Sequence, residues 1–411
     1  MVASSALLTD HYELTMLDAS LAAGTAERRV TFEVFTRSLP PGRRYGVFAG
    51  LGRLLDALHD FRFGAAELEW LASRRIVSER AAEWLGSYRF NGDIDAYREG
   101  ELYTGGSPVL TVNGTFAESV LLETLVLSVL NHDSAVAAAA SLISAAAGDR
   151  PVIEMGSRRT DPDAAVAAAR AAYIGGLSST SNLEAGRRYG LPTTGTSAHA
   201  FVLLFADERH AFDAQLSSQG TSTTLLVDTY DTTNAIKMAV EAAGPGLGAI
   251  RIDSGDLGAE AVRARSLLDS LGATETRVVV TGDLDEASIG RLASTPVDAY
   301  GAGTSVVMGG GFPTCGFVYK LVAVDGRPVQ KQSPGKETVG GVKRAWRVAA
   351  DALEVVGEAP FEGPAGGRPL QDRVVEAGRR LAGPALDASR DLHLRCRDEL
   401  GPDRTLLIQR V

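Results

Sequence analysis

The middle of the chain repeats one pattern of hydrophobic and polar positions. Between residues 151 and 307, short apolar runs end in polar or glycine-containing turns, and most are followed by a segment of helical composition. The seven runs are PVIEM, GLSSTS, PTTGTS, TLLVDT, GAIRID, RVVVTG and PVDAYGAG. Strands that alternate with helices indicate βαβ units and a parallel sheet. A series of this length favours closure into an α/β barrel, with an open doubly wound sheet as the alternative.

The two ends of the chain show a different pattern. Residues 31–112 mix short β-like runs with helical stretches, without strict alternation. After residue 316, the runs FVYKLVAV and RPVQKQ predict a hairpin with Asp325 and Gly326 as its turn. We therefore expect the barrel and its mouth in residues 116–316, and a second α/β domain built from residues 1–115 and 317–411.

The most apolar stretch of the chain, residues 116–147, is long enough to suggest a membrane span. Polar residues interrupt it before 18 apolar residues accumulate, so we expect two buried helices and no membrane. The interrupting residues are Glu118, Glu123, Asn131, His132 and Asp133. The amino terminus has no basic region followed by a long apolar run, so no secretory signal is expected. Two cysteines without metal-ligand spacing fit a reduced cytoplasm.

Composition narrows the class of partner. The chain has 411 residues, room for two or three domains, and a formal net charge of -10. This acidic balance argues against binding to nucleic acid or to an anionic membrane, because both need a basic field. It does not bear on small phosphates. Four of the five lysines lie close together, and we expect a solvated hairpin face, with contact to phosphate as the alternative: Lys320, Lys331, Lys336 and Lys343.

Unusual polar residues gather where the apolar runs end. In α/β barrels the loops that follow the strands converge on one mouth, which carries the active site. Any one of these residues has an ordinary role as a helix cap, but their joint position favours a functional site. They are Arg158, Arg159, Thr180, Ser181, Asn182, Thr196, His199, Asp228, Arg251, Asp253, Ser254, Asp256, Gly282, Asp283, Gly301, Gly303 and Thr304.

Three short segments carry candidate chemistry. Gly303 and Thr304 in GAGTSVV are suited to holding a phosphate, although a plain glycine turn explains them equally well. Arg251 and Asp253 in RIDSGDL lie on the same face of one strand, either to bind an anion or to form a structural ion pair. His199 in GTSAHAF opens an apolar helix, where a structural histidine is the alternative to a catalytic one. The metal ligands are unknown.

Ten short segments, in order from residue 9 to about residue 347, resemble the nicotinate phosphoribosyltransferase family. Each is weak alone, but ten in one order are specific. They are TDHYELTM, FEVFTRSLPPGRRYGVFAGL, LLETLVLSVLNH, EMGSRR, YIGGLSSTSN, GTSAHAF, LVDTYDT, RIDSGDL, GAGTSVV and VYKLV. Departures from the family pattern are small and include His11 and Glu13, where Leu and Gln are expected, and Met155, where an aromatic residue is common.

The resemblance implies a fold and a reaction. The fold is an irregular α/β barrel of the type II phosphoribosyltransferase kind, with a second α/β domain made from both chain ends, in a cytoplasmic homodimer with shared active sites. The reaction is the transfer of phosphoribosyl from phosphoribosyl pyrophosphate to nicotinate, which gives nicotinate mononucleotide for NAD salvage. ATP hydrolysis through a phosphohistidine assists it, and Mg²⁺ arrives with the polyphosphate substrates.

The resemblance also assigns roles to individual residues. His199 accepts the phosphoryl group of ATP, and Arg251 pairs with the nicotinate carboxylate. Tyr12 stacks on the pyridine ring, Thr196 contacts the substrate and Thr304 holds the 5′-phosphate. The remaining expected substrate-binding residues are Arg158, Asp253, Ser254 and Gly303. Two alternatives remain, a related transferase that prefers nicotinamide and a non-catalytic paralogue that binds nucleotide precursors.

Overall fold

The structure is a computed structural model that describes residues 4–332, 338–348, 352–381, 383 and 385–411. It divides the chain into two compact units. Unit 1 comprises Met1–Ala138 and Phe312–Val411, and unit 2 comprises Ala139–Gly311. The division falls inside helix α6, Glu123–Ala147, later than the boundary expected at residue 116. The reason is that the first half of α6 packs into the core of unit 1, through residues such as Leu125 and Leu130.

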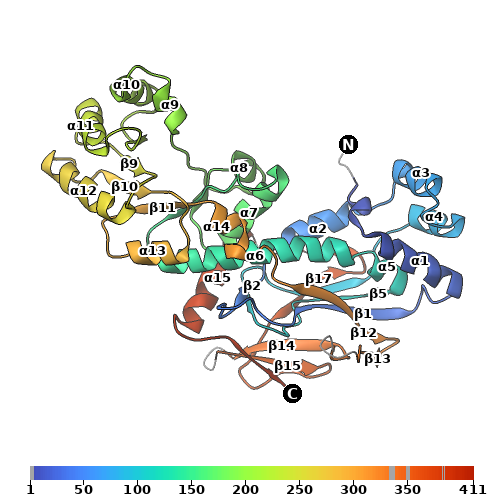
Figure 1. Ribbon diagram of the computed structural model, residues 1–411. Helices are drawn as coiled ribbons and strands as arrows, with labels where there is room; N and C mark the ends of the chain where they lie inside the picture. The colour runs from blue at the N-terminus through green and yellow to red at the C-terminus, as the bar shows by residue number, and fades with distance from the viewer. Residues whose placement is uncertain (1–3, 333–337, 349–351, 382, 384) are drawn as a thin grey trace. The chain divides into compact units, whose positions relative to one another are not determined.

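Unit 2 is built on a six-stranded sheet whose order is β7-β6-β11-β10-β9-β8. All its recorded strand pairs are parallel, and Figure 1 shows the sheet with helices packed around it. The predicted α/β architecture is confirmed, as a curled half-barrel. The strands are β6 Val152–Glu154, β7 Ser179–Thr180, β8 Thr224–Leu226, β9 Ala249–Ile252, β10 Arg277–Val280 and β11 Ala299–Ala302.

The expected count of seven strands in unit 2 is wrong by one. The run PTTGTS forms only an isolated bridge between Thr193 and Thr180. This run contains no large apolar side chain, and Pro192 has no N–H to donate to a ladder. The edge strands β7 and β8 therefore stay unpaired with each other among the described residues of unit 2, which leaves the barrel irregular.

The helices of unit 2 follow the strands as predicted. Several begin at a side-chain cap. The alternative of a helix-cap role is therefore right for Asn182, which caps α8, and for Asp256, which caps α12. The helices are α7 Pro162–Ile174, α8 Leu183–Tyr189, α9 His199–Leu203, α10 Glu208–Gln219, α11 Thr232–Ala243, α12 Leu257–Ser270, α13 Glu286–Leu292 and α14 Thr304–Val307.

Unit 1 joins the two ends of the chain in one mostly antiparallel domain, which confirms that prediction. Strand β1 pairs with β5 on one side and with β12 on the other, so residues about 290 positions apart lie side by side. The larger sheet has the order β13-β12-β1-β5-β3-β17-β18. Its strands are β1 Arg29–Thr36, β3 Asp93–Tyr97, β5 Leu110–Thr115, β12 Phe317–Val324, β13 Arg327–Pro328, β17 Gln371–Glu376 and β18 Arg379–Arg380.

A four-stranded sheet of order β16-β14-β15-β19 completes unit 1, with a two-stranded ladder of β2 Gly46–Val47 and β4 Leu102–Tyr103. The strands of the four-stranded sheet are β14 Lys343–Val348, β15 Leu353–Glu358, β16 Arg368–Pro369 and β19 Leu407–Arg410. Figure 1 shows helices on one face of the larger sheet and β14 and β15 on the other. Besides the first half of α6, the α-helices of unit 1 are α1 His11–Ala23, α2 Leu51–His59, α3 Ala65–Ser73, α4 Glu79–Gly86, α5 Phe116–Val120 and α15 Leu386–Leu400.

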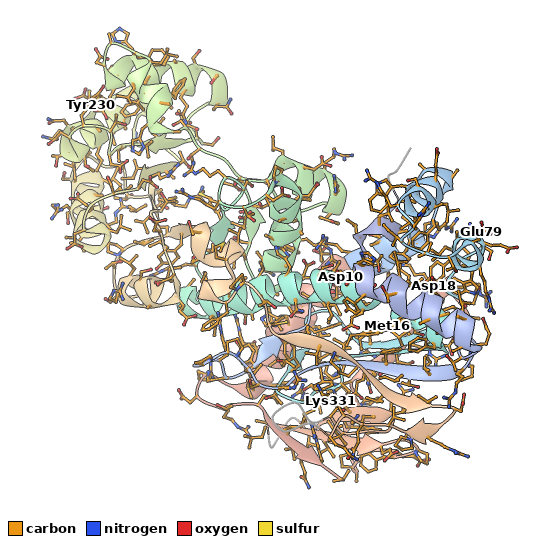
Figure 2. The ribbon with its side chains drawn as sticks, turned by 45° about the vertical axis from the view of Figure 1, so that its right-hand side comes forward. Asp10, Met16, Asp18, Glu79, Tyr230 and Lys331 are labelled. Carbon is orange, nitrogen blue, oxygen red and sulfur yellow. The ribbon has the colours of Figure 1, made fainter. Side chains whose placement is uncertain are left out.

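One hydrophobic cluster holds unit 1 together. It includes Leu17 of α1, Leu54 of α2, Phe32 of β1 and Val356 of β15, all 5 % exposed or less. A polar contact fixes α1 to α4, because Asp18 accepts hydrogen bonds from the backbone N–H and the hydroxyl of the N-cap Ser78 (Figure 2). Burial of this apolar surface supplies the main stabilisation of the unit.

The apolar stretch of residues 116–147 forms two helices, α5 and α6, as predicted. It is long and apolar enough to cross a membrane by length and composition, and 67 % of its most apolar window is buried. Thr115 caps α5 in a capping box with Glu118, so the interrupting glutamate begins a helix inside the fold. The stretch is therefore part of the core.

The lysine cluster is not the single solvated face that the sequence suggested. Lys343 is buried, and its ammonium group lies 3.1 Å from one carboxylate oxygen of Glu33. Lys320 lies 3.6 Å from Glu123, whereas Lys331 is exposed on the surface. The prediction is therefore wrong for Lys343, because β14 turns this side chain toward β1. Lys336 lies outside the described residues.

Candidate active site at the carboxyl ends of the parallel strands

Polar residues at the carboxyl ends of four strands of unit 2 surround one cavity of about 170 Å³, whereas Thr196, His199 and Ser254 are not among its lining residues. Strands β6, β9, β10 and β11 each contribute from the loop at their carboxyl ends, as expected for a parallel sheet. The cavity contains five of the predicted substrate-binding residues, and adds Arg159, Thr281 and Asp283 to the charged and hydroxyl groups there. The lining residues are Met155, Arg158, Arg159, Arg251, Asp253, Thr281, Gly282, Asp283, Gly301, Gly303 and Thr304.

Arg251, near the end of β9, is the best-held cation of this cavity. Its Nε donates to the hydroxyl of Thr281 at 2.9 Å, and its Nη1 donates to the hydroxyl of Thr196 at 2.6 Å. Its Nη2 lies 3.0 Å from Oδ1 of Asp253. The residue is only 9 % exposed, so its guanidinium has a fixed position at the cavity wall. The structural ion pair considered for Arg251 and Asp253 is thus present, beside the cavity.

Asp253 stays an anion in this setting. Burial alone would raise the pKa of its carboxyl group, but hydrogen bonds from Thr281 and Arg251 outweigh burial and hold the pKa below its ordinary value. The positive charges of Arg251 and of His199 when protonated act in the same direction. The pair therefore presents a fixed cation together with its own counter-ion, and a ligand carboxylate would compete with Asp253 for the same guanidinium.

His199 begins α9 and pairs with an aspartate from a different loop. Its Nε2 lies 3.1 Å from Oδ1 of Asp228, whose side chain is 4 % exposed, while the histidine side chain is 38 % exposed. The other oxygen of Asp228 accepts from the backbone N–H of Asp253 at 3.0 Å and from the hydroxyl of Ser254 at 2.6 Å. Asp228 therefore joins the histidine to the loop that follows Arg251.

Beneath the cavity lies a buried carboxyl group that the sequence analysis did not single out. Glu154, the last residue of β6, accepts from the hydroxyl of Thr180 at 2.6 Å and from the backbone N–H of Gly156. Burial raises the pKa of Glu154, and these two hydrogen bonds counteract part of the rise. It ties β6 to β7 and holds the loop that presents Arg158 and Arg159 to the cavity.

Gly303 and Thr304, which the sequence suggested as phosphate holders, line the cavity. Thr304 is exposed and is the first residue of α14, which follows β11 directly. A side chain at residue 303 would place its Cβ 3.0 Å from the backbone oxygen of Met155, so this glycine also has a packing reason. The loop brings backbone N–H groups and a hydroxyl to the same cavity as Arg158.

Tyr12 is the one predicted site residue that belongs to the other unit. It lies on α1 in unit 1 and is 44 % exposed. Partial burial raises the pKa of its hydroxyl well above 10, and the nearby carboxylates of Glu123 and Glu13 raise it further. The tyrosine is therefore neutral at physiological pH, and it is one of the exposed aromatic residues of unit 1.

Thr281 is a contact of the site that the sequence did not assign, and Asp228 was expected at the mouth but without a role of its own. Both stand near the carboxyl end of a predicted strand, which was the available signal. Thr281 comes two residues after Val279, and Val279 is paired with Arg251 in the β9–β10 ladder, so the two side chains lie on one face. Within the described parts of the chain, no group of three or more His, Cys, Asp and Glu residues is placed to hold a metal ion.

Comparisons with known proteins agree on the family. The model of the nicotinate phosphoribosyltransferase N-terminal domain matches residues 7–131, and that of the quinolinate phosphoribosyl transferase C-terminal domain matches residues 136–308. A nicotinate phosphoribosyltransferase of Mycobacterium tuberculosis is 56 % identical over 402 residues, which cover 94 % of this chain and 89 % of that protein. The enzyme of the same name from Bacillus subtilis is 37 % identical over 84 % of this chain and 73 % of its own length.

Solved structures show the same similarity in three dimensions. Human nicotinic acid phosphoribosyltransferase superposes with a TM-score of 0.85 at 27 % identity, over 98 % of this chain and 97 % of that one. A nicotinate-nucleotide pyrophosphorylase from Pyrococcus furiosus superposes with a TM-score of 0.81 at 26 % identity, over 96 % of this chain and 95 % of that one. The resemblance therefore extends over both units.

Proposed function

The chain belongs to the nicotinate phosphoribosyltransferase family, and on that basis we propose that it forms nicotinate mononucleotide from nicotinate and phosphoribosyl pyrophosphate in NAD salvage. The observation that supports this most directly is the cavity of unit 2, where a fixed arginine lies among phosphate-holding loops. The pyridine nitrogen is already a nucleophile, so the reaction needs no general base. The barrier lies in the departure of pyrophosphate from an oxocarbenium-like ribose, which positioning and fixed charge can lower.

Arg251 is the group that would recognise the nicotinate carboxylate. Its bonds to Thr196 and Thr281 hold the guanidinium plane in place, and its ion pair with Asp253 keeps the cation satisfied before the substrate arrives. Nicotinamide carries no charge to compete for this cation. Loss of a charge-assisted hydrogen bond would disfavour the amide by roughly 1–3 kcal/mol.

The donor phosphates are assigned to the opposite side of the same cavity. Arg158, Gly303 and Thr304 would hold the 5′-phosphate and the pyrophosphate by charge and by N–H and hydroxyl donors. Mg²⁺ would arrive with the polyphosphate and neutralise part of its charge. The oxygen ligands that the chain offers there are the carboxylates of Asp253 and Asp283, which suit a hard cation, and phosphates and water would complete its coordination.

We assign His199 as the residue that accepts the γ-phosphoryl group of ATP. If Nε2 donates its proton to Asp228, the lone pair is on Nδ1, which becomes the nucleophile toward ATP. The bond that forms is Nδ1–P and the bond that breaks joins the γ-phosphorus to the β,γ-bridging oxygen, with ADP leaving. Hydrolysis of the phosphohistidine would then couple ATP to the transfer.

Incubation with γ-labelled ATP tests this role. We expect label that is acid-labile and base-stable, present in the parent and absent in His199→Asn, while slow ATP-independent transfer survives in both. His210→Asn is the matched control, because His210 is also paired with an aspartate but lies exposed on α10. Label that persists in His199→Asn would exclude the phosphohistidine at this position.

A homodimer with shared sites is part of the proposal, as is a cytoplasmic location. Several apolar side chains next to the site residues of unit 2 are exposed and would be covered by a partner, among them Leu183, Leu204 and Tyr230, of which Figure 2 labels Tyr230. If Tyr12 acts in the site of the partner, an equimolar mixture of Tyr12→Ala and His199→Asn subunits that reassociate at random should recover about a quarter of the ATP-stimulated activity, because half of the dimers are mixed and each of these has one intact site of two. No recovery on mixing would place Tyr12 in its own subunit's site.

A further inference from the structure

Unit 1 contains a second charged cavity, distinct from the site of unit 2. Its volume is about 240 Å³, and three segments far apart in sequence form it. These are the end of α2 with the following residues to Arg62, the link Arg89–Asn91 between α4 and β3, and the hairpin of β17 and β18. We call it the arginine cavity.

The described residues that line the arginine cavity carry only positive or neutral side chains. Arg62, Arg89, Arg379 and Arg380 line it together with His59. Arg380 pairs with Asp56 on the rim, whereas Arg62 and Arg379 have no ion pair with any described residue. All four arginines are exposed, and in a chain with a net charge of -10 their guanidinium groups repel one another around this cavity unless an anion binds there.

The arginines are presented by a rigid frame. The turn between β17 and β18 has positive φ at Ala377 (47°) and at Gly378 (73°). The N–H of Gly378 donates to the oxygen of Gly92 at 2.8 Å, and a Cβ at residue 378 would lie 2.2 Å from the oxygen of Phe90. The hairpin is therefore pressed against the link that carries Arg89, and Arg379 has a fixed starting position.

The floor of the arginine cavity is apolar and closely packed. Leu55, Phe61, Phe90 and Val375 line it and are between 1 and 8 % exposed. The ring of Phe61 packs edge-on against that of Tyr88, with centroids 5.7 Å apart. This apolar floor gives the organic part of a ligand a surface on which to pack.

We propose that the arginine cavity binds the phosphate group of a small phosphorylated metabolite, whose organic part rests on the apolar wall. Guanidinium groups bind phosphate with two parallel hydrogen bonds, and this geometry suits phosphate better than a monatomic ion. The volume equals about eight water molecules, at about 30 Å³ each, enough for a phosphate and a small organic group. This inference goes beyond the transferase reaction, and only the second pyrophosphate site counted in its test rests on that reaction.

Calorimetry on the full chain tests the proposal, with inorganic phosphate, pyrophosphate and AMP as probes. We expect pyrophosphate to bind at two sites per chain, and Arg62→Gln/Arg379→Gln to weaken one of them at least tenfold without changing transfer from saturating substrates. The control Arg74→Gln/Arg75→Gln removes the same charge from the exposed end of α3 and should leave both sites intact. Melting temperatures of all variants report whether the fold is kept.

Two results would overturn the arginine cavity as a site. Unchanged pyrophosphate binding in Arg62→Gln/Arg379→Gln would show that these arginines do not contact the phosphate. An equal loss of binding in the control pair would show that the effect comes from net charge alone. The probes also test the organic part. We expect AMP to bind the cavity at least tenfold more tightly than inorganic phosphate, and equal affinity for the two would contradict a phosphorylated metabolite.

Discussion

Two networks built on pairs of opposite charge serve different ends in this chain. At the cavity of unit 2, Arg251 donates to Asp253 and to the hydroxyls of Thr196 and Thr281, and all of these residues except Thr196 line the cavity. In unit 1, Lys343 and Glu33 are buried side chains at the wall of a cavity of about 360 Å³, and the ammonium group donates to both oxygens of Glu33 and to two backbone oxygens. We call the first network open, because a ligand can replace one of its partners, and the second closed, because the chain itself accepts every hydrogen bond that the ammonium group can donate. A partner that a ligand can replace, and not the presence of charge or of a cavity, distinguishes the functional network.

The largest effect on stability is expected from the closed network. Lys343→Met leaves Glu33 buried without a counter-ion, and burial already raises the pKa of this carboxyl group. We expect a loss of about 3–5 kcal/mol in the free energy of unfolding, with little change in the transfer rate of the folded enzyme. All three tryptophans, Trp70, Trp84 and Trp346, lie in unit 1, so their fluorescence in urea measures this unit.

The double variant Glu33→Gln/Lys343→Met is the control for that measurement. Because it removes both charges, it should recover at least half of the lost stability. A single variant as stable as the parent would show that the pair of unit 1 is not closed, and the contrast between the two networks would fail.

A substitution in the open network should lower catalytic activity instead of stability. Arg251→Ala is expected to lower kcat/KM for nicotinate by a hundredfold or more, because the carboxylate loses its cation and Asp253 loses its partner. The affinity for phosphoribosyl pyrophosphate should change little. Steady-state kinetics with each substrate varied in turn gives both numbers. Arg277→Ala, at the opposite end of the neighbouring strand β10, is the matched control and should leave kcat/KM unchanged.

The position of the open network could be predicted from the sequence because it follows from topology. Arg251 and Asp253 are two residues apart in a strand, and the carboxyl ends of parallel strands meet at one mouth. The pairing of His199 with Asp228 could not be predicted, because it joins loops 29 residues apart whose course no local pattern determines. The roles of individual residues at the mouth came from the resemblance to the family.

The closed network was missed for a physical reason. Lys343 follows a polar, glycine-rich segment, which predicts a solvated residue, and Glu33 is the single charge in the run FEVF of a strand. Their burial results from the packing of β14 on β1, a contact between segments 310 residues apart. The extent of unit 1 was also hidden, because α6 continues through the division without a turn or a glycine.

A smaller effect on activity is expected from Asp228, the residue of the open network that positions His199. Asp228→Asn keeps the shape of the side chain but weakens its hold on His199, on Ser254 and on the N–H of Asp253. Labelling of His199 by ATP should slow by about tenfold to a hundredfold, a typical cost for a group that orients a catalytic residue. Asp213→Asn on α10 makes the same charge change at an exposed position. Labelling at the parental rate in Asp228→Asn would assign the aspartate a structural role only.

The smallest effect concerns Glu13, which is buried on α1 and accepts hydrogen bonds from Thr124 and Thr9. Burial raises the pKa of this carboxyl group above its ordinary value of 4.5. As pH rises above 4.5 the carboxyl group ionises first in the unfolded chain, so the parent loses stability until the pH reaches the folded pKa of Glu13, and the loss persists at higher pH.

Glu13→Gln removes this dependence, because an amide can accept from Thr124 and donate to Thr9 without a charge. We expect a gain in stability on the order of 1 kcal/mol at pH 7 and none at pH 4, measured by tryptophan fluorescence in urea. Equal stability of parent and variant at both pH values would mean that Glu13 ionises in the folded chain as it does in water.

The substrate preference of the parent chain tests the central claim most directly. With phosphoribosyl pyrophosphate, ATP and Mg²⁺ present, the kcat/KM for nicotinate and for nicotinamide is measured by the formation of each mononucleotide. The open network predicts formation of nicotinate mononucleotide with one pyrophosphate released per turnover, and a preference of at least tenfold over nicotinamide. Equal turnover of the two pyridines, or no mononucleotide from either, would contradict the function assigned to the cavity of unit 2.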